Sequence, residues 1–264
     1  MLVELAGATW TGVGERPLVV VPVGSTEQHG PHLPFATDTI VATAVARGAA
    51  EALPQEVVVA PALAFGSSGE HQSFPGTVSI GREALHLVVL ELARSLATWA
   101  GRVVLVNGHG GNAPTLVSAV AQLIAEGHDI AWAPCAPLSS DRPGGRVTAV
   151  ASAPGDGRIA GATTREDLPA PDAHAGFWET SLMLHLQPAS VRTPLPPAGD
   201  VRPMSELLPE LTASGVRAVS PSGILGDPTG ATAARGAAIF DALVDALTTR
   251  IVEGTRDANG MLRA

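Results

Sequence analysis

Short apolar runs alternate along the chain with longer segments in which apolar residues recur every three or four positions. The short runs are rich in Val, which is typical of strands buried on both faces of a sheet. The longer segments have the period of amphipathic helices. Strands are predicted at residues 19–23, 57–63, 103–106, 130–134 and 216–219, and helices at residues 38–53, 82–100, 112–126, 180–186 and 230–253.

Strands that alternate with helices predict an α/β fold with a mainly parallel sheet, covered by helices on both faces. The crossovers between its strands should be right-handed. The pattern is lost at residues 138–171, which are rich in Gly, Pro, Ser, Asp and Arg and predict a long loop. Residues 255–264 are predicted to form a loose tail. We therefore expect a single domain over residues 1–254.

Side chains of the types that bind metals follow two of the predicted strands. Glu27, His29 and Asp38 follow the first strand, and His109 follows the strand at residues 103–106. Residues two apart in an extended segment point the same way, so Glu27 and His29 can converge on one point. Because open α/β sheets place their sites at the carboxyl ends of the strands, these side chains should lie together. Imidazole and carboxylate groups suit a divalent transition metal.

A further cluster, His174 and Glu179, lies close to the helix predicted at residues 180–186. With the residues above it supplies enough carboxylates and imidazoles for two metal ions, if one carboxylate bridges them. Zn, Fe(II) and Mn(II) all accept such ligands, so the metal stays open. A histidine that is not needed as a ligand could transfer a proton, because its pKa lies near neutral pH.

The turn that follows the second strand also carries polar side chains. Glu70 and His71 stand at the end of a Gly-rich segment and are candidates for the wall of a substrate groove. A plain surface turn explains them equally well. Both interpretations stay open at this point.

Composition narrows the chemistry further. The chain has no tyrosine, and all 16 of its basic residues are arginine, which excludes a Schiff-base lysine and a P-loop. The net charge of −9 gives no sign of binding to nucleic acid or to an acidic membrane. The single cysteine, Cys135, lies in an apolar run and is predicted to be a core residue. One cysteine, no signal peptide and no apolar run long enough to cross a bilayer predict a cytoplasmic protein.

Four segments together resemble the creatininase (creatinine amidohydrolase) family: residues 27–34 with Thr37-Asp38, residues 74–77, residues 107–112 and residues 179–184. The resemblance implies a three-layer α/β/α fold, a homo-oligomer (hexamer or octamer) and a two-metal site that hydrolyses amide-type C–N bonds. It also implies roles for single residues. The implied metal ligands are Glu27, His29, His109 and Asp38, with Asp38 as the bridge, and the implied proton-transfer residue is His174.

The chain departs from creatininase itself at two places. Creatininase has a glutamate ligand two positions after the histidine that matches His109, and this chain has Gly111 there. Glu179 is the expected substitute. Creatininase also has a Trp-Asp pair before the histidine that matches His174, where this chain has Ala170-Pro171, so creatinine is not the expected substrate.

Within the family, residues 172–184, 215–221 and 226–231 look closest to the peptidases of the mycofactocin system. That resemblance implies release of a modified C-terminal Val-Tyr dipeptide from a short precursor peptide. A related small-molecule amidohydrolase, acting on a cyclic amide or a formamide, is the alternative.

Two other classes of protein are open from the sequence. Gly108-x-Gly110-x-x-Ala113, between a strand and a helix, also resembles a dinucleotide fingerprint, but it leaves Glu27 and His29 unexplained. A scaffold stabilised by a metal is the second class. Structural zinc sites are usually rich in Cys, and this chain has a single one.

Overall fold

The computed structural model describes residues 1–138 and 168–264, so the loop predicted at residues 138–171 lies almost entirely outside the described residues. Five strands form one parallel sheet in the order β1-β3-β2-β4-β5. The strands are β1 (Leu2–Glu4), β2 (Leu18–Val23), β3 (Val57–Val59), β4 (Arg102–Asn107) and β5 (Ile130–Pro134).

Four of the predicted strands are confirmed as β2, β3, β4 and β5, although β3 ends four residues earlier than its apolar run. The sequence pattern does not predict β1. Three residues are too few to show a period, and Leu2–Glu4 becomes a strand only by pairing with β3 at the edge of the sheet.

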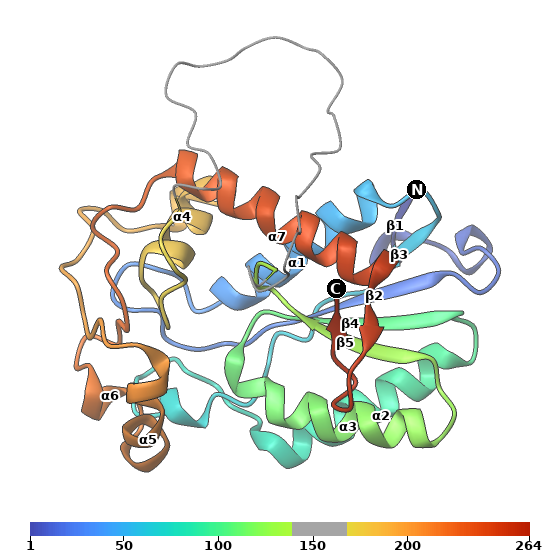
Figure 1. Ribbon diagram of the computed structural model, residues 1–264, viewed down its shortest axis with the longest axis horizontal. Coiled ribbons are helices and arrows are strands. Elements are labelled where there is room, and N and C mark those ends of the chain that lie inside the picture. The colour runs from blue at the N-terminus through green and yellow to red at the C-terminus, as the bar shows by residue number, and fades with distance from the viewer. Residues whose placement is uncertain (139–167) are drawn as a thin grey trace, which may run out of the picture.

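Helices cover both faces of the sheet, which confirms the three-layer α/β/α fold (Figure 1). Alternate residues of β2 face opposite layers. Val20 packs in the core under α1 and α7, whereas Val19 and Val21 pack against α2 and α3. The helices are α1 (Thr37–Ala52), α2 (Gly81–Ala97), α3 (Ala113–Ala125), α4 (Phe177–Leu186), α5 (Met204–Ser214), α6 (Val216–Val219) and α7 (Ala233–Glu253).

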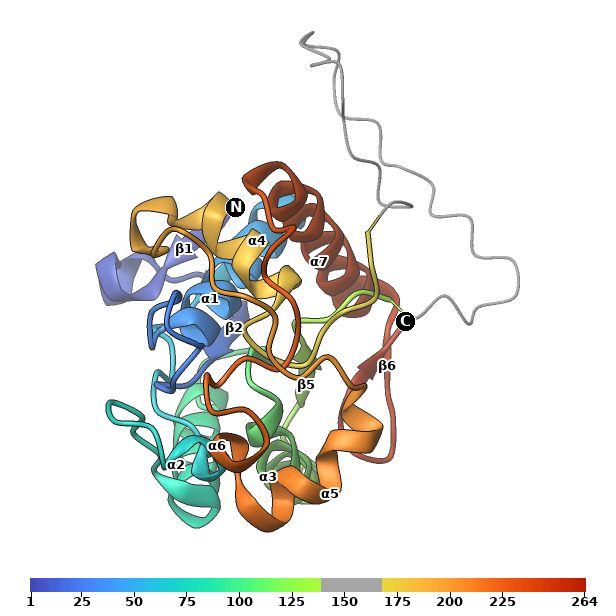
Figure 2. The ribbon, with the colours of Figure 1, turned by 90° about the vertical axis from the view of Figure 1, so that its left-hand side faces the viewer.

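The prediction of a strand at residues 216–219 is wrong, because these residues form the short helix α6. Val216 is buried against Leu207 and Leu211 of α5 in a small apolar cluster apart from the two main cores. A four-residue apolar run fits a buried helix turn as well as a strand. In Figures 1 and 2, α5 and α6 lie side by side at one end of the molecule, and both contact the turn after β3.

The C-terminal residues are not loose as expected. Thr255–Arg256 (β6) and Leu262–Arg263 (β7) pair as antiparallel strands. The turn between them lies against β5, where the Trp132 amide donates to the carbonyl of Gly260 at 3.1 Å. Leu262 is buried in the core that α1 and α7 cover. These contacts order the segment, whereas the division of the chain at residue 254 stays a prediction.

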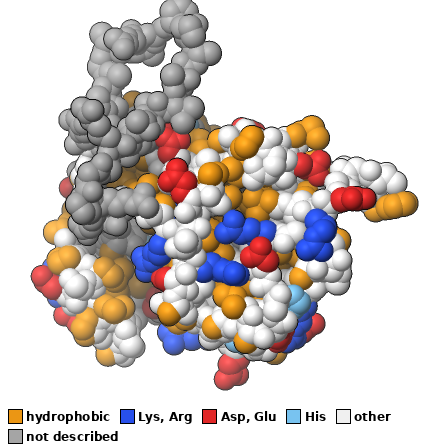
Figure 3. Space-filling model, turned by 45° about the vertical axis from the view of Figure 1, so that its right-hand side comes forward, with side chains coloured by type: hydrophobic (Ala, Val, Ile, Leu, Met, Phe, Trp, Pro, Cys, Tyr) orange, Lys and Arg blue, Asp and Glu red, His pale blue; other side chains and the backbone are white. Residues whose placement is uncertain are grey.

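The surface carries both positively and negatively charged side chains. On the part of the face in Figure 3 that described residues form, arginines and acidic side chains are interspersed among apolar ones rather than gathered by sign. This view therefore shows no continuous basic stripe of the kind that follows a phosphate backbone. Among residues 1–138 and 168–264, no helix is long and apolar enough to cross a membrane.

Candidate metal centre

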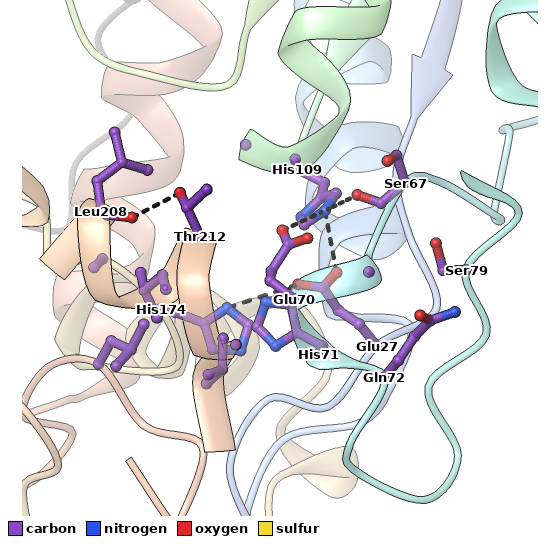
Figure 4. Close-up of a pocket in the computed structure, with 18 of the residues that line it drawn as sticks. Glu27, Ser67, Glu70, His71, Gln72, Ser79, His109, His174, Leu208 and Thr212 are labelled. Carbon is purple, nitrogen blue, oxygen red and sulfur yellow. Dashed lines mark hydrogen bonds and ion pairs between the residues drawn. The ribbon is translucent and has the colours of Figure 1, made fainter. Parts of the chain in front are cut away.

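The carboxyl ends of β3, β2 and β4 are adjacent, because these strands are neighbours in the sheet. The polar residues that follow them therefore meet at one place, as the sequence predicts (Figure 4). The loop after β2 supplies Glu27 and His29, and the first turn of α1 supplies Asp38. The 3₁₀ turn Gly69–His71 supplies Glu70 and His71, and the loop after β4 supplies His109. His174 lies in the segment before α4, and Glu179 lies in the first turn of that helix.

Asp38 lies at the centre of the site. Its Oδ1 is 3.0 Å from Nε2 of His29, its Oδ2 is 3.3 Å from Nδ1 of His109, and the Ser25 hydroxyl donates to Oδ2 at 2.7 Å. Burial disfavours a charge on Asp38, but the two histidines hold its pKa well below the usual value. A carboxylate whose two oxygens face two different histidines is placed to bridge two cations.

Main-chain carbonyls fix how these two histidines face Asp38. Nδ1 of His29 is 3.1 Å from the carbonyl oxygen of Glu27, and Nε2 of His109 is 3.1 Å from that of Ser67. A carbonyl only accepts hydrogen bonds, so these nitrogens carry the hydrogens. The opposite nitrogen of each ring is turned toward Asp38. Metal-binding histidines are held in this way by their second nitrogen.

Glu27 is a buried carboxylate without a hydrogen bond. Both of its oxygens lack an aligned donor among the described residues, although Nε2 of His109 and Nε2 of His71 approach to 3.2 and 3.3 Å. Burial alone would raise the pKa of Glu27, but the nearby His109 lowers it to about 2. A buried anion that lacks hydrogen bonds is costly, and a bound cation would satisfy it. The residues present therefore fit a metal.

Three groups of side chains within residues 1–138 and 168–264 bring potential ligand atoms within 4.8 Å of one another. The first two of the groups named in the next sentence contain all five predicted ligands, so the structure brings these side chains together. The groups are Glu27, Asp38 and His109; His29, His174 and Glu179; and Glu27, His71 and His174.

Glu179 does not lie beside Gly111. Its Oε2 is 3.9 Å from Nε2 of His29, on the other side of the site. The space beside Gly111 is taken by Glu70, whose Oε1 is 2.6 Å from the position that a Cβ at residue 111 would occupy. The same oxygen is 3.6 Å from Nε2 of His109. The carboxylate beside Gly111 and His109 thus comes from Glu70.

Glu70 and His71 both line the pocket. The side chain of His71 is buried beside Glu27, whereas Glu70 is partly exposed. From the sequence both residues could equally belong to a surface turn. Only the adjacency of β3 and β2 shows that this turn lies against Glu27. His32, by contrast, hydrogen-bonds Thr180 at 2.8 Å and belongs to none of the three groups.

Asn112 is a residue whose role the sequence does not show. It is fully buried, and its amide nitrogen donates to the carbonyl of Gly24 at 2.9 Å while its oxygen accepts from the Ser67 amide at 2.8 Å. One side chain thereby joins the loops that follow β2, β3 and β4. The only signal in the sequence is its place in the Gly-rich segment that contains His109.

A pocket of about 910 Å³ opens above these residues. Glu27, Glu70, His71, His109 and His174 point into it (Figure 4). The opposite wall comes from α5 and is mainly apolar, with Met204, Leu208 and Leu211. The site therefore combines convergent charged groups with an apolar surface large enough for a small organic substrate.

Comparison with known proteins identifies the family. The sequence model of the creatininase family, described as creatinine amidohydrolase, matches residues 6–251. The chain belongs to the creatininase family. This creatininase-family protein is 47% identical, over 98% of its length and 94% of the other chain, to a protein of Mycobacterium tuberculosis (strain H37Rv) named mycofactocin precursor peptide peptidase.

Solved structures agree with this assignment. A mutant creatininase has a TM-score of 0.69 and 27% identity, over 96% of this chain and 98% of its own. The structure named "Creatininase Mn" has a TM-score of 0.67 and 27% identity over the same shares of the two chains. The protein is therefore a metal-dependent hydrolase of C–N bonds, as the sequence motifs predict.

Proposed function

We propose that this protein is the peptidase that releases the modified C-terminal Val-Tyr dipeptide from the mycofactocin precursor peptide. The observation that carries the proposal is the 47% identity, over nearly the whole of both chains, to a protein named mycofactocin precursor peptide peptidase. The pocket agrees with it. The apolar wall from α5 suits the side chains of Val and Tyr, and the polar floor suits the amide bond between residues.

We propose two metal positions, one on each side of Asp38. Glu27 and His109 would hold the first ion, and His29 and Glu179 would hold the second. Glu70 lies beside His109, with 3.6 Å between Oε1 and Nε2, and is proposed as a further carboxylate near the first ion. Divalent ions such as Zn, Fe(II) or Mn would polarise the scissile carbonyl and make water more acidic.

His174 is the proposed proton-transfer residue. Its Nε2 is 2.7 Å from the carbonyl oxygen of Gln28, so the unprotonated Nδ1 faces the site, 3.8 Å from Oε1 of Glu27. This nitrogen can accept a proton from the attacking water and then give it to the amide nitrogen as the C–N bond breaks. The ring lies in the pocket lining and has only 7% of its surface exposed.

The alternative substrate is a small cyclic amide or a formamide. The test is mass spectrometry of the products after the metal-loaded protein is incubated with the radical-enzyme-modified precursor peptide, with creatinine and with a simple formamide in parallel. We expect a C-terminal dipeptide-derived fragment, and its loss when a chelator is present. Consumption of a small amide with the peptide left intact would contradict the peptidase proposal and retain the hydrolase.

Some expectations from the sequence remain predictions. A homo-oligomer, hexamer or octamer, and a place in the cytoplasm belong to this proposal. His109 of the Gly108-x-Gly110 segment faces Asp38 and Glu27, which argues against the dinucleotide alternative. A titration with NAD should show no binding.

A further inference from the structure

Gln28 lies between the two proposed ligands Glu27 and His29 in the chain, with only 5% of its surface exposed. Its amide orientation is fixed by two main-chain groups. The amide of Gly30 donates to Oε1 at 2.9 Å, and Nε2 donates to the carbonyl of Gly223 at 3.1 Å. An N–H group requires the oxygen and a carbonyl requires the nitrogen, so the reversed amide would lose both bonds.

This orientation determines which nitrogen of His71 is protonated. The second hydrogen of the Gln28 amide points to Nδ1 of His71, with 2.8 Å between the nitrogens. Nδ1 must accept this bond, so the hydrogen of the neutral ring lies on Nε2. Nε2 is 3.3 Å from Oε1 of Glu27. The N–H of His71 therefore lies on the side of Glu27, close to Oε1 but without the alignment of a hydrogen bond, and the ring offers no lone pair to a metal there.

Gln28 acts on His174 through its main chain. Its carbonyl oxygen is 2.7 Å from Nε2 of His174, which places the hydrogen on Nε2 and leaves Nδ1 as an acceptor. The amide nitrogen of Gln28, 3.1 Å from the same Nε2, is a second donor and makes no bond with it. Nδ1 faces the same Glu27 oxygen that His71 faces. The two rings, with centroids 4.4 Å apart, thus present opposite hydrogen-bonding groups to one point.

We propose that Gln28 is a positioning residue that sets both histidines. Its side chain keeps the N–H of His71 on the side of Glu27, so that this ring is excluded from the ligand set. Its main-chain carbonyl keeps Nδ1 of His174 free for the proton. The part that concerns His174 rests on the proposed proton transfer, in which that nitrogen takes one proton from water and returns it to the leaving nitrogen. The part that concerns His71 does not depend on any substrate.

Gly223 supports the arrangement. It has a φ of 81°, and a Cβ there would lie 1.9 Å from Oε1 of Gln28. Only glycine lets this turn reach the amide closely enough to hold it.

The direct test is NMR of the full-length, metal-stripped protein with ¹⁵N-labelled histidine at neutral pH. Burial, followed by the neighbouring His174, lowers the pKa of His71 to about 3. Burial also lowers the pKa of His174. We expect the hydrogen on Nε2 of both rings, with signals assigned from His71→Gln and His174→Gln. A hydrogen on Nδ1 of His71 in the unchanged protein would overturn the proposal.

The matched variant is Gln28→Glu, which keeps the acceptor for Gly30 and replaces the donor to His71 by an acceptor. We expect Nδ1 of His71 to become protonated. With metal restored, kcat should fall about 10- to 100-fold, as for other residues that orient a metal site. KM should stay within about twofold, because Gln28 does not line the pocket. Gln55→Glu adds the same charge at an exposed position and should change neither kcat nor KM.

The outcomes separate this proposal from the proposed function. If Gln28→Glu leaves the His71 signals and kcat unchanged, Gln28 has no positioning role. If the precursor peptide is not cleaved but a small amide is, kcat is measured with that amide, and the NMR result still decides the His71 part. If Gln28→Glu lowers the melting temperature too far for the measurement, Gln28→Met removes the donor without adding a charge. A hydrogen that stays on Nε2 of His71 alone in Gln28→Met would equally overturn the proposal.

Discussion

At the scale of single residues, the centre depends on which nitrogen each histidine turns inward. His29, His109 and His174 each hold one ring nitrogen against a main-chain carbonyl and turn the other toward carboxylates. His71 is the exception, because a side-chain amide donates to it. The same residue type therefore serves as ligand, proton carrier or donor according to its second partner.

Metal binding should release protons. Burial opposes a charge on His29, but Asp38 and Glu179 raise its pKa to about 10, and Glu27 and Asp38 raise the pKa of His109 well above its usual value. In the metal-free protein both rings are therefore protonated at neutral pH, and each must lose one proton to bind an ion. We expect about two protons released per pair of ions, and affinity that rises with pH up to about 10.

Calorimetric titrations with metal in two buffers of different ionisation enthalpy measure this release. A heat that does not depend on the buffer would contradict it. The control is His86→Gln, since the ring of His86 hydrogen-bonds Ser118 on α3, away from the site. This variant should release as many protons as the unchanged protein.

The raised pKa of His29 also makes the stability of the metal-free protein depend on pH. The contribution of His29 to the free energy of unfolding is complete below pH 6.5 and is lost as the pH rises through about 10.

Glu70 and Glu179 should affect different ions. Glu70→Gln removes the carboxylate beside His109, and Glu179→Gln removes the one beside His29. Each change should lower the affinity for one of the two ions by about 10- to 100-fold. Elemental analysis after dialysis against low metal, with Glu51→Gln as an exposed control, should show one retained ion in each variant. Two retained ions in Glu70→Gln would leave Glu70 as a wall residue only.

At the scale of elements, the order of the strands builds the site. β2 lies between β3 and β4, so the loops after all three meet, and Asn112 joins them by hydrogen bonds to Gly24 and Ser67. Rigid strands beneath the loops limit how far the ligands can move. Damage to the core under β4 should therefore reach the site.

Leu105 tests this dependence. It is fully buried in β4, among the residues that face α2 and α3. Leu105→Ala should lower the free energy of unfolding by about 2–5 kcal/mol. The control is Leu87→Ala on α2, where the side chain is 61% exposed and the change should stay within about 0.5 kcal/mol. Urea unfolding followed by circular dichroism measures both, and equal values would contradict the argument.

At the scale of the whole molecule, the C-terminal pair of strands closes the sheet. The turn between β6 and β7 lies along β5, which would otherwise present a free edge, and Leu262 fills the core beside α7. Exposed edges of β-sheets are sites of aggregation. The C-terminus is thus part of the fold although its sequence is short and polar.

Removal of residues 255–264 should lower the melting temperature and promote aggregation, because it uncovers β5 and leaves a cavity at Leu262. Leu262→Ala, which keeps the edge covered, should lower the melting temperature without aggregation. Calorimetry and light scattering distinguish the two effects. An unchanged melting temperature in the shortened chain would show that the segment is dispensable.

The sequence by itself determined the alternating strands and helices, the parallel sheet and the family, because buried Val-rich runs and a motif such as Glu27-Gln28-His29 are local signals. It also predicted that Glu27, His29, Asp38 and His109 lie together, since open α/β sheets place their sites at the carboxyl ends of the strands. Tertiary structure alone decided the rest: the strand β1, the helix α6, the ordered C-terminus, the position of Glu70 beside Gly111 and the inward face of each histidine. The physical reason is that each depends on a partner far away in the chain, and a local pattern carries no information about that partner.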